Sequence, residues 1–291
     1  MALPNHVKKR IASLKKEYET LRPDKESLLR LIEETEIPES VYNSNAIENS
    51  TLTLKETEKI LLEMEVERTV DLREVFEAKN LARVMEYARK KDFWGGAVEI
   101  EKMLLLHKML LENIRSDIAG RFRKKGEYVR VGTHVAPAPE KIEELLRQAQ
   151  VEYASDDQTY FLDKVAKFHM DFETVHPFND GNGRIGRILI NLQLRQYGYP
   201  PVIIQNKEKK EYYRAFREYR VDSKLKIMAR ILTLSLLESL HKRVAHLRGM
   251  RIVQLSEYSK RNKRSLQAML NSAKRQTIPA FREKGIWNIG T

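Results

Sequence analysis

The feature that most constrains the fold is the spacing of apolar residues, which recur every three or four positions along almost the whole chain. In residues 5–21 this spacing places Ile11, Leu14 and Tyr18 on one face of a helix. Such a stripe is typical of an amphipathic helix that buries one face against its neighbours. The sequence therefore predicts a mainly α-helical protein.

Residues that cap or break helices divide this pattern into segments. Thr53 and Glu56 have the spacing of a capping box, Gly95-Gly96 interrupts the chain, and Pro38 follows the end of an early helix. The predicted helices cover residues 5–21, 25–36, 54–66, 71–90, 97–112, 140–152, 158–175, 184–197, 207–221 and 223–246. The last of these is apolar on all sides, which predicts a central helix of a bundle.

One segment, residues 126–139, departs from the helical pattern. Tyr128 and Val129 are strand formers, Gly132-Thr133 can turn, and Pro137 prevents a helix. These residues predict a short β-hairpin on the helical scaffold. Because an isolated hairpin is only marginally stable, we expect it to pack against the body.

Composition narrows the class of protein. Charged residues make up 32% of the chain and cysteine is absent, which excludes disulfides, thiolate metal sites and cysteine nucleophiles. No apolar stretch approaches the ~20 residues that span a bilayer, and the first residues contain no apolar run of signal-peptide length. These features predict a cytoplasmic protein with no membrane partner.

The net charge of +12 is concentrated near the C-terminus. Residues 241–291 contain twelve Lys or Arg residues against two Glu residues. A basic block this local indicates contact with nucleic acid or another polyanion, while a solvated charged surface is the alternative. The charge pattern alone leaves both interpretations open.

The segment His176–Arg187, with the sequence HPFNDGNGRIGR, combines several features of a phosphate site. Pro177 ends the preceding helix, and the Gly181-Asn182-Gly183 run favours left-handed backbone that directs N–H groups to one point. The helix that follows adds the positive end of its dipole at that point. We also expect Phe178, the apolar residue of this loop, to pack into the core.

The charged residues of the loop extend this interpretation. Arg184 and Arg187 are three residues apart and can bind phosphates, and Asp180 supplies a hard oxygen ligand that suits Mg²⁺. His176 has a side chain that titrates near neutrality and can act as a general base. Each feature alone also fits an ordinary turn or a solvated helix, but their combination within twelve residues predicts a nucleoside triphosphate site. By contrast, we expect His107 to be a packed, hydrogen-bonded histidine.

The segment resembles the signature of the Fic family, HPF-x-(D/E)-GNGR-x-x-R, at every specified position, and the resemblance extends over residues 40–247. It implies a Fic-type helical bundle with a β-hairpin flap. It also implies a protein adenylyltransferase that uses ATP and Mg²⁺ to attach AMP to Ser, Thr or Tyr. Other members transfer UMP, phosphate or phosphocholine, and ATP is the default donor.

The resemblance also implies roles for individual residues. His176 would deprotonate the target hydroxyl, Asp180 would hold Mg²⁺, and Gly181, Asn182 and Gly183 would cradle the α- and β-phosphates. Arg184 would bind phosphate, and Arg187 would bind the γ-phosphate. The other residues that the resemblance assigns to ATP are Ile185, Gly186, Val131, Gly132, Thr133, His134, Tyr212, Tyr213 and Arg220. Relatives have Asn at the position of Arg220, which leaves the contact with the adenine base open.

Two further features concern partners and regulation. The hairpin, residues 128–135, would clamp the target protein by strand addition. Ser44 and Glu48 lie four residues apart and match the family's inhibitory pattern (S/T)-x-x-x-E-(G/N). The resemblance implies that Glu48 competes with the γ-phosphate for Arg187, and that it can also support removal of AMP. Many relatives dimerise, and a homodimer is open here too.

The basic C-terminal segment has the order helix, turn, helix, hairpin, which resembles the winged helix appended to many Fic proteins. We therefore predict an N-terminal helical region (1–70) with an inhibitory helix at about 40–49, a Fic core (71–247) and a winged-helix domain (248–291). The winged helix could bind DNA or protein. The alternative to an enzyme is a DNA-binding regulator that senses nucleotide, but such a sensor needs no base at His176.

Overall fold

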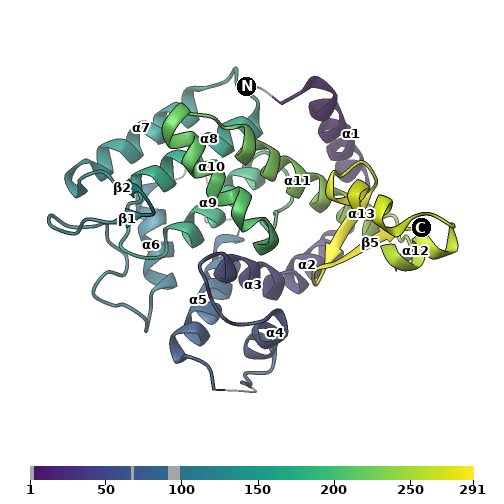
Figure 1. The fold of residues 1–291 in the computed structure, drawn as a ribbon, viewed down its shortest axis with the longest axis horizontal. Helices are drawn as coiled ribbons and strands as arrows, with labels where there is room; N and C mark the ends of the chain where they lie inside the picture. Colours follow the sequence, from purple (N-terminus) through teal and green to yellow (C-terminus); the bar gives the residue numbers. More distant parts are fainter. Residues whose placement is uncertain (1–2, 67–68, 91–98) are drawn as a thin grey trace.

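A computed structural model describes residues 3–66, 69–90 and 99–291. The protein is a mainly helical bundle, as predicted, with a small β-containing unit at the C-terminal end (Figure 1). The helices are α1 (Asn5–Leu21), α2 (Glu26–Thr35), α3 (Ile37–Ile47), α4 (Leu54–Leu62), α5 (Leu72–Ala88), α6 (Ile100–Leu110), α7 (Ile142–Ser155), α8 (Phe161–Val175), α9 (Asn182–Gln196), α10 (Lys209–Asp222), α11 (Lys226–Leu247), α12 (Leu255–Arg261) and α13 (Leu266–Lys274). The strands are β1 (Arg130–Val131), β2 (His134–Val135), β3 (Ile252–Gln254), β4 (Ala280–Glu283) and β5 (Ile286–Gly290).

The capping residues act largely as their sequence predicts. Thr53 accepts from the backbone N–H of Glu56, and the Glu56 side chain accepts from the N–H of Thr53, which completes the capping box of α4. Pro38 ends no helix by itself, because it lies in the first turn of α3, where a missing N–H costs nothing. Helix α3 therefore begins before the predicted range of about 40–49 and ends at Ile47. The predicted break at Gly95-Gly96 lies outside the described residues.

Two apolar cores hold the bundle together. The first joins α1 and α2 to α8, α10 and α11, and the second joins α3 through α7 to α8 and α9. Helices α8 and α9 contribute to both cores, with Met170 and Ile190 in the first and Phe172 and Ile185 in the second. Each core contains residues from before and after position 70. The predicted boundary at residue 70 therefore does not separate two independent cores.

Helix α11 is buried along most of its length, as its apolar sequence predicts. Against its C-terminal half packs a third, smaller cluster formed by residues 253–289. There β3, β5 and β4 form an antiparallel sheet in that order, beside α12 and α13. The sequence analysis missed β3, because this three-residue strand is defined only by its pairing with the distant β5.

The C-terminal unit is fastened to the bundle by polar contacts. The N–H groups of Lys284 and Gly285, in the turn between β4 and β5, donate to the buried carboxylate of Glu39 in α3 at 2.8 and 3.1 Å. The guanidinium of Arg282 pairs with Glu238 of α11 at 2.5 Å. These contacts place the C-terminal unit against the same helix that carries Ser44. Within the described residues, no helix combines the length and apolar character needed to cross a bilayer.

A buried histidine lies between the bundle and the C-terminal unit. His241 of α11 has Nδ1 2.8 Å from Oε1 of Gln276, and its Nε2 is 3.4 Å from the Arg10 guanidinium. Because an arginine can only donate, Nε2 accepts and Nδ1 carries the proton. Burial lowers the pKa of His241 to about 4, so the ring is neutral in the folded protein at neutral pH.

We expect His241 to make stability depend on pH. The unfolded chain binds a proton at His241 near pH 6.5 while the folded protein does not, so stability falls as pH drops from about 6.5 towards 4. This one group should remove about 1.5 kcal/mol between pH 6.5 and 5. Urea unfolding of the wild type and His241→Asn across this range measures the difference in slope.

The matched control is His6→Asn, because His6 is exposed on α1. That variant should keep the pH dependence of the wild type, whereas His241→Asn should be less stable at pH 7 and have a flatter profile. Equal slopes for the wild type and His241→Asn would contradict the assignment.

Candidate active site

The loop between α8 and α9 is held by its own residues. Helix α8 ends at Val175, and His176 takes the left-handed conformation at φ 49° immediately before Pro177. Phe178 is fully buried, as predicted, and its ring stacks on His107 with centroids 3.8 Å apart. The two polar ends of the Asn182 side chain bond the backbone N–H and C=O of Phe178 at 2.9 and 2.8 Å. The loop is therefore rigid before any ligand arrives.

His107 is a packed, hydrogen-bonded histidine, as predicted. Its Nδ1 accepts from the N–H of Gly120 at 3.0 Å, so Nε2 carries the proton and donates to the carbonyl of Asp180 at 3.1 Å. Burial lowers the pKa of His107 to about 4 and keeps the ring neutral. His107 thus holds the loop in place through its hydrogen bond to Asp180 and its stacking on Phe178.

The start of α9 is a candidate anion site. Gly181 has a positive φ of 81°, whereas Asn182 and Gly183 are already the first residues of the helix. Of the three residues predicted to favour left-handed backbone, only Gly181 adopts it, because the helix begins at Asn182, two residues before Arg184. The first turn of α9 leaves N–H groups without helical partners and places the positive end of the helix dipole there.

The carboxylate of Glu48 occupies this anion site. Its Oε1 lies 2.9 Å from Nη2 of Arg187, and a Cβ at Gly183 would collide with the same oxygen. Ser44 binds Arg187 twice, accepting from Nε through its hydroxyl and from Nη2 through its carbonyl, each at 2.9 Å. The end of α3 thus holds a nearly buried guanidinium with three contacts from one helical face.

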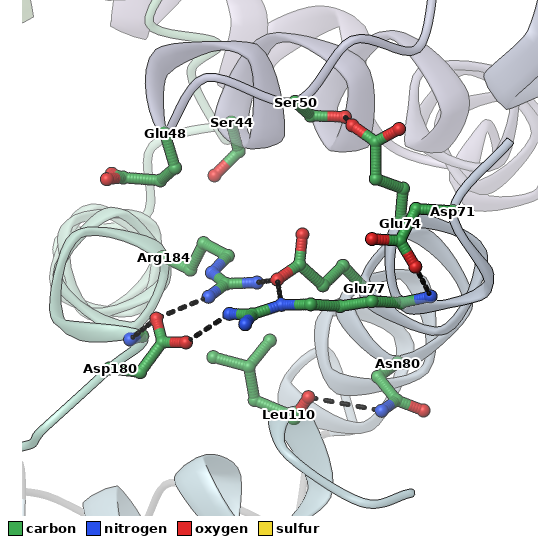
Figure 2. Close-up of polar contacts among 12 residues, drawn as sticks. Ser44, Glu48, Ser50, Asp71, Glu74, Glu77, Asn80, Leu110, Asp180 and Arg184 are labelled. Atoms are coloured by element: carbon green, nitrogen blue, oxygen red, sulfur yellow. Dashed lines mark hydrogen bonds and ion pairs between the residues drawn. The ribbon is translucent and has the colours of Figure 1, made fainter. Parts of the chain in front are cut away.

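The other arginine of the loop faces α5. Figure 2 shows Arg184 between Asp180 and Glu77, with Nη2 2.8 Å from Asp180 Oδ1 and Nη1 3.3 Å from Glu77 Oε1. The side chain of Arg184 is only 3% exposed, so α5 and the loop share it as a structural cation. The second oxygen of Asp180 pairs with Arg73 of α5 at 2.6 Å. Arg184 and Arg187 therefore point to different neighbours, although three residues separate them.

Asp180 is the residue that the sequence assigns to Mg²⁺. Burial by itself raises the pKa of Asp180, but the charges of Arg184 and Arg73 outweigh it and the pKa is lowered. Within the described ranges, no cluster of three or more His, Asp or Glu residues could hold a metal. A single hard, ionised oxygen ligand still fits Mg²⁺, which takes most of its ligands from water and phosphate, provided that the ion replaces the exposed Arg73.

Two loop residues assigned to ATP point inward. Ile185 is fully buried in the second core, and its N–H donates to the carbonyl of Gly181. A Cβ at Gly186 would lie 2.8 Å from Glu173 Oε1 and 3.0 Å from His169 Nδ1. This close approach explains the glycine at position 186, and nucleotide contact by either residue stays a prediction.

The tyrosine pair of α10 lies beneath the site. Tyr212 is 1% exposed, and its hydroxyl is 2.8 Å from Nε2 of His169 and 3.5 Å from Nη1 of Arg187. The hydroxyl of Tyr213 donates to the carbonyl of Ile47 at the end of α3. Tyr213 therefore contacts the segment that delivers Glu48, and the adenine-binding role of both tyrosines stays a prediction.

The short hairpin forms as predicted, with Val131 opposite His134. Gly132 and Thr133 make its turn, and Nε2 of His134 bonds the carbonyl of Thr174 in α8 at 2.9 Å. The guanidinium of Arg220 donates to the carbonyl of Glu173, the residue before Thr174, at 3.2 Å. Flap and α10 thus meet at the last turn of α8, next to His176.

Arg123 and Glu173 are neighbours of His176 that the sequence analysis missed. The guanidinium of Arg123 is buried and donates to the carbonyls of His176, Glu127 and Pro137 at 2.9, 3.0 and 2.8 Å. It joins the base of the flap to the loop. The sequence around Arg123 does not reveal this role, because all of these partners are backbone carbonyls rather than side chains that form a motif.

Comparisons with known proteins agree with this geometry. Residues 97–194 match the Fic/DOC family. The protein adenylyltransferase Fic of Culex quinquefasciatus is 32% identical over 184 residues, which cover 60% of this chain and 35% of that protein. The match thus spans little more than a third of the curated relative.

Solved structures share the fold. A Fic domain-containing signalling protein from Bacteroides thetaiotaomicron superimposes with a TM-score of 0.73 at 24% identity, over 82% of this chain and 97% of that one. A Fic family protein from Desulfovibrio desulfuricans superimposes with a TM-score of 0.68 at 20% identity, over 100% of this chain and 97% of that one. The second similarity includes the C-terminal unit.

Proposed function

We propose that this protein transfers AMP from ATP to a hydroxyl group of a protein side chain, since residues 97–194 match the Fic/DOC family. The observation that carries the proposal is that one short loop joins His176, the C-cap of α8, to the N-terminus of α9, where the carboxylate of Glu48 binds Arg187. A base and a phosphate site on one rigid loop are what transfer of a nucleotidyl group needs. The name of the Culex relative favours AMP as the group.

The chemistry follows from these positions. His176 takes the proton of the target hydroxyl, and the oxygen then forms a bond to the α-phosphorus of ATP. The bond from that phosphorus to the bridging oxygen of the β-phosphate breaks, and diphosphate leaves. The N-terminus of α9 stabilises the charge on the phosphates. Asp180 would hold Mg²⁺, which would supply further neutralisation of that charge.

The first prediction concerns the base. His176→Ala should lose AMP transfer by a factor of about 10² to 10⁴, because the hydroxyl then keeps its proton. Binding of ATP should stay within twofold, since the anion site of α9 is unchanged. Labelling with α-³²P-ATP and equilibrium binding of ATP measure the two effects. His6→Ala is the control, and undiminished labelling by His176→Ala would refute the mechanism.

We further propose that Glu48 inhibits the enzyme. Its carboxylate and the γ-phosphate compete for the same guanidinium, so ATP that enters beside Glu48 lacks the Arg187 contact. A misplaced triphosphate holds its α-phosphorus out of line with the hydroxyl. The same carboxylate could orient a water molecule against AMP on a modified protein, which would give the reverse reaction.

Glu48→Gly should therefore increase AMP transfer by at least about tenfold, which corresponds to roughly 1.4 kcal/mol of competition removed. Glu63→Gly is a matched control, because Glu63 is an exposed C-cap of α4 away from the loop. Labelling of the protein itself and of lysate proteins, read by mass spectrometry, compares the variants. Equal labelling by wild type and Glu48→Gly would remove the inhibitory role.

A second candidate function is binding of nucleic acid by the C-terminal unit. Four exposed cations flank α13, and within the part of the chain that the structure describes they have no acidic partner: Lys263, Arg264, Lys274 and Arg275. The turn between β4 and β5 is already engaged by Glu39, so the helix rather than the hairpin is the free face. Order β3-α12-α13-β4-β5 supports a winged helix.

Binding of a 20-base-pair duplex should weaken with salt at a log–log slope of about −4, one unit for each phosphate contacted. Alanine at all four cations should abolish the salt-dependent shift. The control replaces four exposed cations elsewhere, Lys9, Lys16, Lys210 and Arg217, and should change binding little. Absence of any shift at low salt would exclude this candidate.

A further inference from the structure

Three titratable side chains form a row at the C-terminal end of α8. His169 and Glu173 lie four residues apart on one face of the helix, and His176 follows three residues later at the C-cap, in the left-handed conformation. His169 is 1% exposed and Glu173 is 5% exposed, while the side chain of His176 is 15% exposed at the end of the row. The row therefore leads from the interior to the loop.

Glu173 faces the inner nitrogen of His176. The Oε2 atom of Glu173 is 3.6 Å from Nδ1 of His176, slightly beyond a hydrogen bond. Nδ1 of His176 and Oε1 of Glu173 are both buried, and neither has a hydrogen-bond partner among the described residues. Catalytic hydrogen bonds are often long without substrate, and a small rotation of either side chain closes this one.

The charge state of Glu173 suits an acceptor. Burial raises the pKa of this carboxyl, but its contact with His176 and the positive charge of Arg187 are among the causes that outweigh burial, so the pKa is lowered. An ionised carboxylate only accepts hydrogen bonds. It therefore requires a proton on the facing nitrogen.

The neighbouring histidine does not compete for this role. Nε2 of His169 is engaged by the hydroxyl of Tyr212 at 2.8 Å, and burial lowers the pKa of His169 to about 4. Its ring is therefore neutral at neutral pH. Glu173 is left as the acidic group that faces Nδ1.

We propose that Glu173 is a positioning residue for His176: its carboxylate accepts a hydrogen bond from Nδ1–H and leaves the lone pair of Nε2 free for the target hydroxyl. The role rests on the proposed function, in which His176 is the base. As the hydroxyl proton moves to Nε2, the ring becomes a cation beside a carboxylate, which stabilises it without taking the second proton.

The packing around Glu173 supports a chemical role. Position 186 favours glycine, because the Cβ of any other residue would lie 2.8 Å from Glu173 Oε1. A buried carboxylate also adds little to the stability of the fold, since an apolar residue of similar size fills such a space without the free-energy cost of desolvating a charge. Both the glycine and the charge are explained if the carboxylate serves the imidazole.

The test uses Glu173→Gln in the Glu48→Gly protein. The amide is nearly isosteric, but its NH₂ group can donate to Nδ1 and favours a proton on Nε2. We expect the rate of AMP transfer to fall by about 100-fold or more while the Kd for ATP stays within twofold. The control is Asp163→Asn, a buried carboxylate ten residues earlier on α8, which should keep the parent rate.

A second readout needs no turnover. ¹⁵N chemical shifts of the histidine rings, with His176 assigned by its loss in His176→Ala, report which nitrogen carries the proton. The parent protein should hold the Nδ1–H form, and Glu173→Gln should shift towards Nε2–H. Glu173→Asp keeps the charge, so it should retain the Nδ1–H form and an intermediate rate, and it substitutes if the glutamine variant does not fold.

Unchanged rate and unchanged ring shifts in Glu173→Gln would overturn the proposal while leaving the proposed function intact. Activity that survives His176→Ala would instead refute His176 as the base. The ring shifts would still decide in that case whether Glu173 sets the proton position on His176.

Discussion

The interaction on which the site depends is the buried guanidinium of Arg187, which joins three helices. It extends from α9 and receives Ser44 and Glu48 from α3, while the hydroxyl of Tyr212 on α10 approaches from the third side. A buried cation must be paired, because an unpaired charge in the interior is costly. As long as no phosphate is bound, Glu48 satisfies this requirement. The Glu48 carboxylate thus stabilises the folded protein through the same contact with Arg187 by which it would compete with the γ-phosphate.

The helix that carries Glu48 is part of the core. Helix α3 packs in the second core, receives two backbone N–H groups of the C-terminal unit on Glu39, and ends at the carboxylate over Gly183. Displacement of Glu48 by a γ-phosphate exchanges one anion for another at Arg187.

The loop has two sides with different tasks. Its open side offers the N-terminus of α9 and His176, whereas its inner side is filled by Phe178, Ile185 and the Glu173 carboxylate. The packed inner residues and the hydrogen bonds of Asn182 to Phe178 fix the loop against the core. A fixed loop would let the proposed base and phosphate site keep their spacing without substrate.

The local pattern of the sequence determined the helices, the capping box at Thr53, the short hairpin and the residues of the loop, because each of these depends on neighbours within a few positions. The pairing of Glu48 with Arg187 was implied by the resemblance to the Fic family. Tertiary structure alone decided where Arg184 points, why position 186 is glycine, and that Arg123 and Glu173 adjoin His176. Their partners lie on other helices or are backbone carbonyls, which leave no periodic signal in the chain. The same holds for β3, whose three residues become a strand only when β5 lies beside them.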